Sequence, residues 1–320
     1  MIRYRNLGSI TVSLEVDKKQ RTLAFTSIVF PGKSSETNAS LLAESIRAFA
    51  GSLSQAPIWI LTPEYGKQLS TTIKEKLLAL NVILTPFEID YEILRFPFTG
   101  EVIATALAES MACGQTDFLV WLSANTVVLQ EPKDFLLQDD KNLGFRPVHH
   151  TLVGSRYDEP LDSFWRLIYR YCNVPEDRIF PMVTHVDETR IRPYFNAGLL
   201  VTRPEKHLLQ AWRDTFFKVY REPSFQEIYQ QDERYKVFIH QAVLSGVILS
   251  TLATHEIKEL PPKYNYPLHL HAQDITDHRP SCLEELVTFR HEGFYRNPKW
   301  FEKMPAKEAL KKWIAERLLR

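Results

Sequence analysis

The sequence has no excess of charge of either sign. Lys and Arg together number 39, Asp and Glu together also number 39, and the formal net charge is therefore zero. A domain dedicated to nucleic acid usually carries a strong basic excess. The charge balance argues against nucleic acid as a partner.

Cysteine is scarce, and long hydrophobic runs are absent. The three cysteines (Cys113, Cys172 and Cys282) are far apart and form no CxxC pair, which argues against a disulfide framework and against a cysteine zinc site. No run approaches the roughly 18 apolar residues of a membrane-spanning helix, and no apolar signal region opens the chain. We therefore expect a soluble, cytoplasmic protein without a transmembrane segment.

The glycine-rich phosphate motifs are also missing. The first predicted core strand, 23–30, is followed by PGKSS at 31–35, which has neither the GxGxxG pattern nor the full GxxxxGK[ST] spacing. This argues against an NAD or FAD enzyme and predicts an ordinary loop before a helix.

The sequence does contain an alternation of short apolar runs and amphipathic segments. The clearest run is FLVWL at 118–122, which is typical of a strand buried on both faces and ends in the polar turn Ser123-Ala124-Asn125. We predict strands at 23–30, 57–62, 82–84 and 118–122, alternating with helices at 39–50, 67–80 and 99–113. Such a pattern is typical of a doubly wound α/β sheet, in which ligands collect at the carboxyl ends of strands.

The second half of the chain continues with further elements. We predict strands at 143–147, 194–202, 259–267 and 287–291, and helices at 163–172, 204–220, 240–250 and 306–320, with polar loop between 220 and 240. No repeat or linker interrupts the chain, so we expect one domain over 1–320, with a hairpin extension at 1–21 and a C-terminal helix in 301–320. That last helix is amphipathic and could pack on the domain or touch a membrane surface.

Five segments occur in a suggestive order: WLSANT at 121–126, FNAGL at 195–199, HQAVL at 240–244, LPPKYN at 260–265 and HEG at 291–293. This order resembles the GT-A nucleotide-sugar glycosyltransferases, in particular the group of glycogenin and the lipopolysaccharide galactosyltransferases. The resemblance covers roughly residues 22–300. It implies a GT-A-like fold, with a mixed, mainly parallel sheet flanked by helices on both faces. It also implies a nucleotide-binding half at 22–130 and an acceptor and sugar half at 131–300.

In the group that the chain resembles, two acids of an Asp-x-Asp motif hold a divalent ion that neutralises the sugar diphosphate as its bond to the sugar breaks. Here Ser123 and Asn125 stand in the places of these acids, and His240 stands in place of the Asp of an Asp-Gln pair. Neither Ser123 nor Asn125 carries charge, so affinity for manganese or magnesium should fall steeply. The late histidine, His291, is retained.

The resemblance also implies roles for the site residues. Ser123 and Asn125 would face the ribose and diphosphate of the donor, and Asn196 and Gly198 would face the sugar. Gln241 would lie on the side of the acceptor.

Three residues have a further candidate role: His240, Asn125 and His291. His240 is a candidate catalytic base, although packing at the start of its helix is the alternative. Asn125 and His291 are candidates for a weak metal site.

Three functional hypotheses follow from the missing acids. The chain could transfer a sugar from a nucleotide-diphosphate-sugar to an unknown acceptor without a metal, with cations covering the diphosphate. The candidate cations are Arg192, Arg203, Arg290, Arg296 and Lys299. It could use a weakly held ion between Asn125 and His291. It could instead be a catalytically inactive module that binds a sugar nucleotide, a glycan or a protein. A hydrolase built on the histidines ranks last, because no clustered carboxylate and histidine motif is present.

Overall fold

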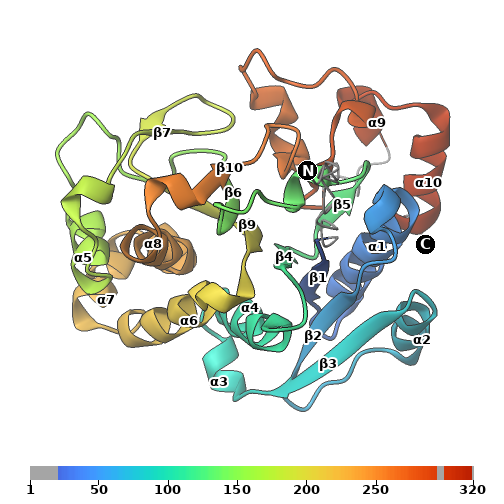
Figure 1. Ribbon diagram of the computed structural model, residues 1–320, viewed down its shortest axis with the longest axis horizontal. Coiled ribbons are helices and arrows are strands. Elements are labelled where there is room, and N and C mark those ends of the chain that lie inside the picture. Colours follow the sequence, from blue (N-terminus) through green and yellow to red (C-terminus); the bar gives the residue numbers. More distant parts are fainter. Residues whose placement is uncertain (1–20, 294–298, 319–320) are drawn as a thin grey trace, which may run out of the picture.

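The computed structural model describes residues 21–293 and 299–318. In this part of the chain the main sheet has the strand order β10-β6-β9-β4-β1-β2-β3 (Figure 1). The strands are β1 (Leu23–Ile28), β2 (Ile58–Glu64), β3 (Val82–Glu88), β4 (Phe118–Leu122), β6 (Leu143–Pro147), β9 (Phe195–Thr202) and β10 (Ile257–Glu259). Strands β1 to β4 run parallel, and β9 runs antiparallel to both β4 and β6. The prediction of a mixed, mainly parallel sheet is confirmed.

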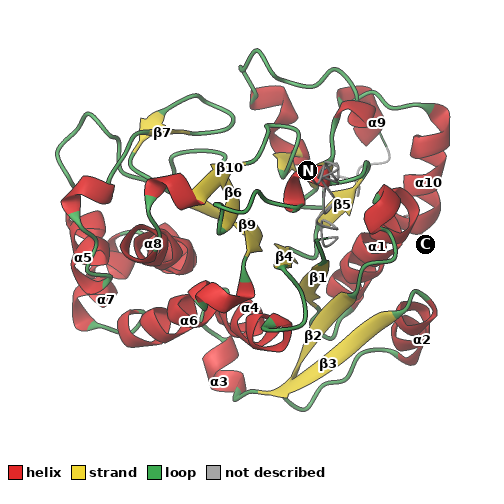
Figure 2. Cartoon of the chain, in the orientation of Figure 1, coloured by secondary structure: helices red, strands yellow, loops and turns green. Residues whose placement is uncertain are grey.

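Helices cover both faces of this sheet (Figure 2). The helices of the described chain are α1 (Lys33–Phe49), α2 (Thr71–Ala79), α3 (Tyr91–Leu94), α4 (Thr99–Ala112), α5 (Ser163–Tyr171), α6 (Leu208–Val219), α7 (Pro223–Gln231), α8 (Glu233–Thr251), α9 (Trp300–Lys303) and α10 (Glu308–Leu318). Along β4, Leu119 and Trp121 pack into the core shared with α4, α6 and α8, while Val120 and Leu122 pack into the core shared with α1 and α2. Burial on both faces explains why the run at 118–122 is apolar throughout.

A small second sheet determines which segments meet at the end of β4. It contains β5 (Thr126–Val128), β12 (Thr288–Arg290) and β11 (Tyr266–Pro267), and a separate pair joins β7 (Met182–Val183) to β8 (Arg190–Ile191). Strand β12 runs antiparallel to β5, with Arg290 opposite Thr126. The late segment that carries Arg290, His291 and Glu292 therefore lies beside the turn that follows β4.

The first predicted loop is in fact the start of a helix. Helix α1 begins at Lys33, six residues before the predicted start at 39. Ser35 Oγ accepts the backbone N–H of Phe30 at 2.9 Å, and Glu36 Oε1 accepts that of Gly32 at 3.2 Å. These side chains satisfy backbone donors at the helix entry, which extends the helix into the polar segment.

The second half departs from prediction in two places. Helix α7 occupies part of the expected polar loop, and α8 begins at Glu233 instead of 240, with the Asp232 side chain accepting the N–H of Arg234 at 2.9 Å. The strand predicted at 259–267 is wrong over most of its length: residues 260–265 form a turn between β10, which ends at Glu259, and β11 at 266–267. The predicted hairpin extension, apart from residue 21, lies outside the described residues, and the division into functional halves stays a prediction.

The C-terminal helix packs on the domain. The centroid of the Trp313 ring in α10 lies 4.8 Å from that of the Phe49 ring in α1, and Arg317 Nε lies 2.5 Å from Glu44 Oε2. Contact of this helix with a membrane surface stays a prediction. Within 21–293 and 299–318, no helix combines the length and the apolar character needed to cross a bilayer.

Candidate active site

The polar tripeptide Ser123-Ala124-Asn125 forms the turn that joins β4 to β5. The N–H of Thr126 donates to the Ser123 carbonyl at 3.0 Å, and the N–H of His291 donates to the Asn125 carbonyl at 3.2 Å. Within the described residues, the Ser123 hydroxyl makes no hydrogen bond to another residue, and Ser123 lines the cavity described below. The turn is therefore rigid in its backbone and presents an available hydroxyl at the carboxyl end of a parallel strand, where ligands collect.

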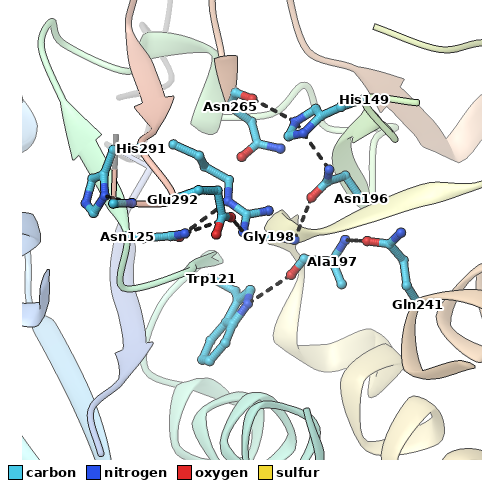
Figure 3. A network of polar contacts seen from close by, with 12 residues as sticks. Trp121, Asn125, His149, Asn196, Ala197, Gly198, Gln241, Asn265, His291 and Glu292 are labelled. Carbon is cyan, nitrogen blue, oxygen red and sulfur yellow. Dashed lines mark hydrogen bonds and ion pairs between the residues drawn. The ribbon is translucent and has the colours of Figure 1, made fainter. Parts of the chain in front are cut away.

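The start of β9 meets this turn because β9 runs antiparallel to β4. The N–H of Ser123 donates to the Gly198 carbonyl at 2.9 Å. The Asn196 side-chain oxygen accepts the N–H of Gly198 at 2.8 Å, and the indole N–H of Trp121 donates to the Ala197 carbonyl at 3.1 Å (Figure 3). The Asn196-Ala197-Gly198 backbone is thus fixed from the side of β4.

Helix α8 holds the same strand from the other side. Gln241 Oε1 accepts the N–H of Ala197 at 2.9 Å, and Ser245 Oγ accepts the N–H of Phe195 at 3.1 Å. These two side chains are four residues apart and share one face of the helix. Gln241 therefore has a structural role in positioning the backbone at the site, and it also lines the cavity.

These elements enclose a cavity of about 650 Å³, within the range of roughly 300–1,000 Å³ that is usual for small-molecule sites. Six of the predicted site residues line it: Ser123, Asn125, Asn196, Gly198, His240 and Gln241. Aromatic side chains form much of the remaining wall: Phe30, Phe98, Trp121, Tyr194, Trp212 and Phe238. The tertiary structure thus brings residues of both halves of the chain to one site.

Arg290 contributes a positive charge to this cavity, and it is the only Lys or Arg among the lining residues of the described chain. Its Nε–H donates to the Asn125 side-chain oxygen at 3.3 Å, and its Nη2 donates to Glu292 Oε1 at 2.5 Å. The Asn125 amide nitrogen donates to the same Glu292 oxygen at 2.8 Å. Asn125, Arg290 and Glu292 form one closed network beside Gly198.

The predicted pair of metal ligands does not fit a divalent ion. His291 is only 1% exposed and does not line the cavity, and its ring lies beyond Asn125, away from Gly198 (Figure 3). The side-chain oxygen of Asn125 already faces the cationic Arg290. Among residues 21–293 and 299–318, no group of three or more His, Cys, Asp or Glu side chains is placed to hold a metal ion.

His240 is buried against aromatic rings. Its ring stacks on that of Phe98 with 4.2 Å between the ring centroids, and Nδ1 lies 2.9 Å from the Val237 carbonyl oxygen. A carbonyl only accepts, so Nδ1 carries the proton and Nε2 is left as an acceptor. Burial lowers the pKa of His240 to about 3. His240 is consequently neutral near pH 7 and acts better as a hydrogen-bond acceptor than as a strong base.

Glu101, in the first turn of α4, lines the cavity as well. The side chain of Glu101 is partly exposed to solvent in the cavity, but the surrounding protein desolvates its carboxyl group. This desolvation raises the pKa of Glu101 to about 7. The sequence alone does not single out this acid as a site residue, because burial cannot be read from a single position at a helix start.

The free energy of unfolding of a Glu101→Gln variant, relative to that of the wild type, is expected to increase by about 2 kcal/mol when the pH is raised from 5 to 8. A raised folded-state pKa means that the carboxyl contributes stability that is fully present below about pH 4.5 and is lost as the pH rises through about 7. The full linkage would be somewhat larger, and partial hydration from the cavity reduces it. Urea unfolding at both pH values measures the difference, and the exposed Glu75→Gln on α2 is the control. A stability difference between Glu101→Gln and wild type that does not change with pH would contradict the prediction.

Comparison with known protein families identifies the family of the chain. Residues 26–251, more than half of the chain, match the family model of the Rhodobacterales glycosyltransferase domain. The chain belongs to this glycosyltransferase family. Its membership confirms the resemblance to glycosyltransferases that the order of the motifs indicates. No curated protein matches the chain.

Solved structures of glycosyltransferases have a related shape at low similarity. Two are structures of LgtC, one an active-site mutant at 14% identity and one a galactosyltransferase complex with donor and acceptor sugar analogues at 13%. Each has a TM-score of 0.45 and covers 92% of this chain and 99% of that chain. The apo structure of the bifunctional glycosyltransferase WbbM has a TM-score of 0.49 at 12% identity, covering 94% of this chain and 52% of that one.

The candidate cations of this glycosyltransferase divide into two groups. Arg290 reaches the cavity, whereas Arg192 donates to the Glu159 carbonyl at 2.8 Å and Arg203 to the Lys141 carbonyl at 3.0 Å, and neither lines the cavity. Lys299 does not line it either, and Arg296 lies outside the described residues. Glu292, which the sequence analysis did not select, joins the site through the pairing of β12 with β5.

Proposed function

We propose that this glycosyltransferase moves a sugar from a nucleotide-diphosphate-sugar donor to an acceptor hydroxyl without a bound metal. The observation that carries the proposal is the cavity at the carboxyl end of β4. There Ser123, Asn125 and Arg290 line one site with the start of β9. A sugar diphosphate needs compensation of negative charge as its bond to the sugar breaks, and a guanidinium in a partly enclosed cavity supplies it.

In the proposed reaction the bond between the anomeric carbon and the β-phosphate oxygen breaks, the acceptor oxygen bonds to that carbon, and the proton of the acceptor hydroxyl passes to the departing nucleoside diphosphate. The Ser123 hydroxyl and Asn125 would contact the ribose and diphosphate. Gly198 would face the sugar, and its lack of a side chain leaves room for the Arg290 guanidinium beside it. The neutral His240 would accept the hydrogen bond of the acceptor hydroxyl, and the Gln241 amide nitrogen would donate to the acceptor.

Asn196 has a more restricted role than the sequence implies. Its side-chain oxygen already accepts the N–H of Gly198, and its nitrogen lies 3.3 Å from His149 Nε2. We assign it to holding the strand that faces the sugar, with remaining capacity for one hydroxyl contact.

A panel of nucleoside diphosphates and their sugars, tested with manganese and with chelator, tests the proposal. A ligand at 100 times its dissociation constant stabilises the folded state by about 2.7 kcal/mol. We expect a raised melting temperature with one base and one sugar, and we expect it to survive chelator. Release of the nucleoside diphosphate from that donor, in the presence of candidate sugar acceptors, then measures turnover. A shift that requires manganese would contradict the metal-independent proposal.

The alternative is a catalytically inactive member of the family that binds a sugar nucleotide, a glycan or a protein. The absence of a metal-binding cluster among the described residues favours it. Binding of a donor without hydrolysis or transfer, both with manganese and with chelator, would support this alternative. Any donor turnover that the purified protein catalyses would exclude it.

A further inference from the structure

The Glu292 carboxylate occupies the position in which an anionic ligand would meet Arg290. Its Oε1 atom accepts hydrogen bonds from two groups at once, Arg290 Nη2 at 2.5 Å and the Asn125 amide nitrogen at 2.8 Å. The three side chains come from two segments of the chain, 165 residues apart at Asn125 and Arg290. A guanidinium and an amide that converge on one oxygen form a binding position for an anion.

We propose that Glu292 is an internal placeholder for the donor diphosphate, which displaces its carboxylate and binds Arg290 and Asn125 in its place. This inference rests on the proposed function. Carboxylate and phosphate oxygens bind a guanidinium in the same geometry, so one can replace the other. In the ligand-free protein the pair keeps the Arg290 guanidinium oriented and its charge compensated.

The exposure of the two side chains makes this exchange feasible. The side chain of Arg290 is 18% exposed, whereas that of Glu292 is 42% exposed and can swing into solvent. A partly exposed ion pair contributes little to stability. Breaking it therefore costs little free energy compared with what the binding of a diphosphate would gain. Arg290 itself stays in place through its second contact, from Nε to Asn125.

The backbone at Glu292 supports a dedicated role. Glu292 has φ of +42°, in the left-handed region that non-glycine residues seldom adopt, and Gly293 follows with φ of +74°. A residue that is held in such a conformation is a sign of a local functional constraint. Here the conformation accompanies the return of the carboxylate toward the arginine two residues earlier in the chain.

The placeholder predicts opposite effects for the two members of the pair. With chelator present, Arg290→Met should weaken binding of the UDP, GDP or inorganic pyrophosphate probe that the wild type binds, by about 30-fold, because a charge-assisted contact is lost. Glu292→Gln should tighten binding of the same probe by about threefold, because a competing anion is removed. Isothermal titration calorimetry measures both, and the gain should be larger at low salt.

A matched exposed pair provides the control. Arg95 and Glu92 form an ion pair at 3.0 Å, both side chains are 66% exposed, and neither lines the cavity. Arg95→Met and Glu92→Gln remove the same charges from the surface and should leave probe binding unchanged. If Arg290→Met does not fold, the tightening by Glu292→Gln still tests the inference.

The possible failures can be told apart. If the wild type binds none of the probes, the proposed function and the placeholder both fail. If the wild type binds a nucleoside diphosphate but Glu292→Gln binds it equally or more weakly, the placeholder is overturned and the proposed function stands. If Arg290→Met binds the nucleoside diphosphate as tightly as the wild type, the placeholder is likewise overturned.

Discussion

A Gly198→Ala variant is expected to lose up to about 30-fold in binding of the diphosphate probe and about 100-fold in donor turnover while it keeps its fold. The added Cβ would lie 2.6 Å from Arg290 Nη1, 3.1 Å from its Cζ and 2.9 Å from the Asn196 side-chain oxygen. The arginine can move, so the cost in stability is small. However, the guanidinium would leave its position beside Asn125, and a displacement of about 1 Å at a reacting site can cost about 100-fold.

The double variant with Arg290→Met isolates the cause. If the alanine acts by displacing the guanidinium, it should have little further effect once Arg290 is methionine, and the two changes will be strongly non-additive. Kinetics and probe binding of the two single variants and the double variant measure this coupling. Simple additivity of the two losses would mean that Gly198 acts on the sugar directly, independently of Arg290.

An Arg146→Ala variant is expected to lose about 3 kcal/mol of the free energy of unfolding. Arg146, on β6, is 3% exposed. Its Nη1 donates to the Leu260 carbonyl at 2.6 Å and pairs with Glu259 at 2.7 Å, and its Nη2 contacts His185 Nδ1 at 2.5 Å. Truncation leaves a cavity and removes the donor of a buried carbonyl, and these two effects together account for the expected loss.

The partner of Arg146 is a suitable control because it is far more exposed. The side chain of Glu259 is 51% exposed, so Glu259→Gln should cost less than about 1 kcal/mol. Urea denaturation of both variants measures the contrast. A loss as large for Glu259→Gln as for Arg146→Ala would show that the ion pair, and not the buried hydrogen bonds and packing, stabilises this region.

The buried strands could be read from the sequence because their composition reports their environment. The strand predicted at 118–122 has those bounds as β4, and the one predicted at 194–202 is β9 with one residue fewer. The start of α1 was placed too late because its polar first turn is stabilised by Ser35 and Glu36, whose capping contacts with residues 30 and 32 the hydrophobic pattern does not record.

The candidate site could be predicted from the polar turn at a strand end and from the order of the motifs. Ser123, Asn125, Asn196 and Gly198 line the cavity as expected, because the end of β4 and the start of the antiparallel β9 meet at one edge of the sheet. His291 was expected beside them, but the alternation of side chains along an extended segment turns it away. Its neighbours on either side, Arg290 and Glu292, line the cavity instead.

The sequence by itself determined the alternating layers of the fold and the resemblance to sugar transferases, because periodicity and short motifs are local properties of the chain. It also determined that the two acids of the metal motif are absent. The tertiary structure alone decided which charged residue lies where the two acids are absent. It also decided the pKa values of Glu101 and His240. Only the pairing of β12 with β5 brings Arg290 to Asn125, and only burial raises the pKa of Glu101 and lowers that of His240. Contacts across 165 residues and the exclusion of water are properties of the folded chain, and no local pattern encodes them.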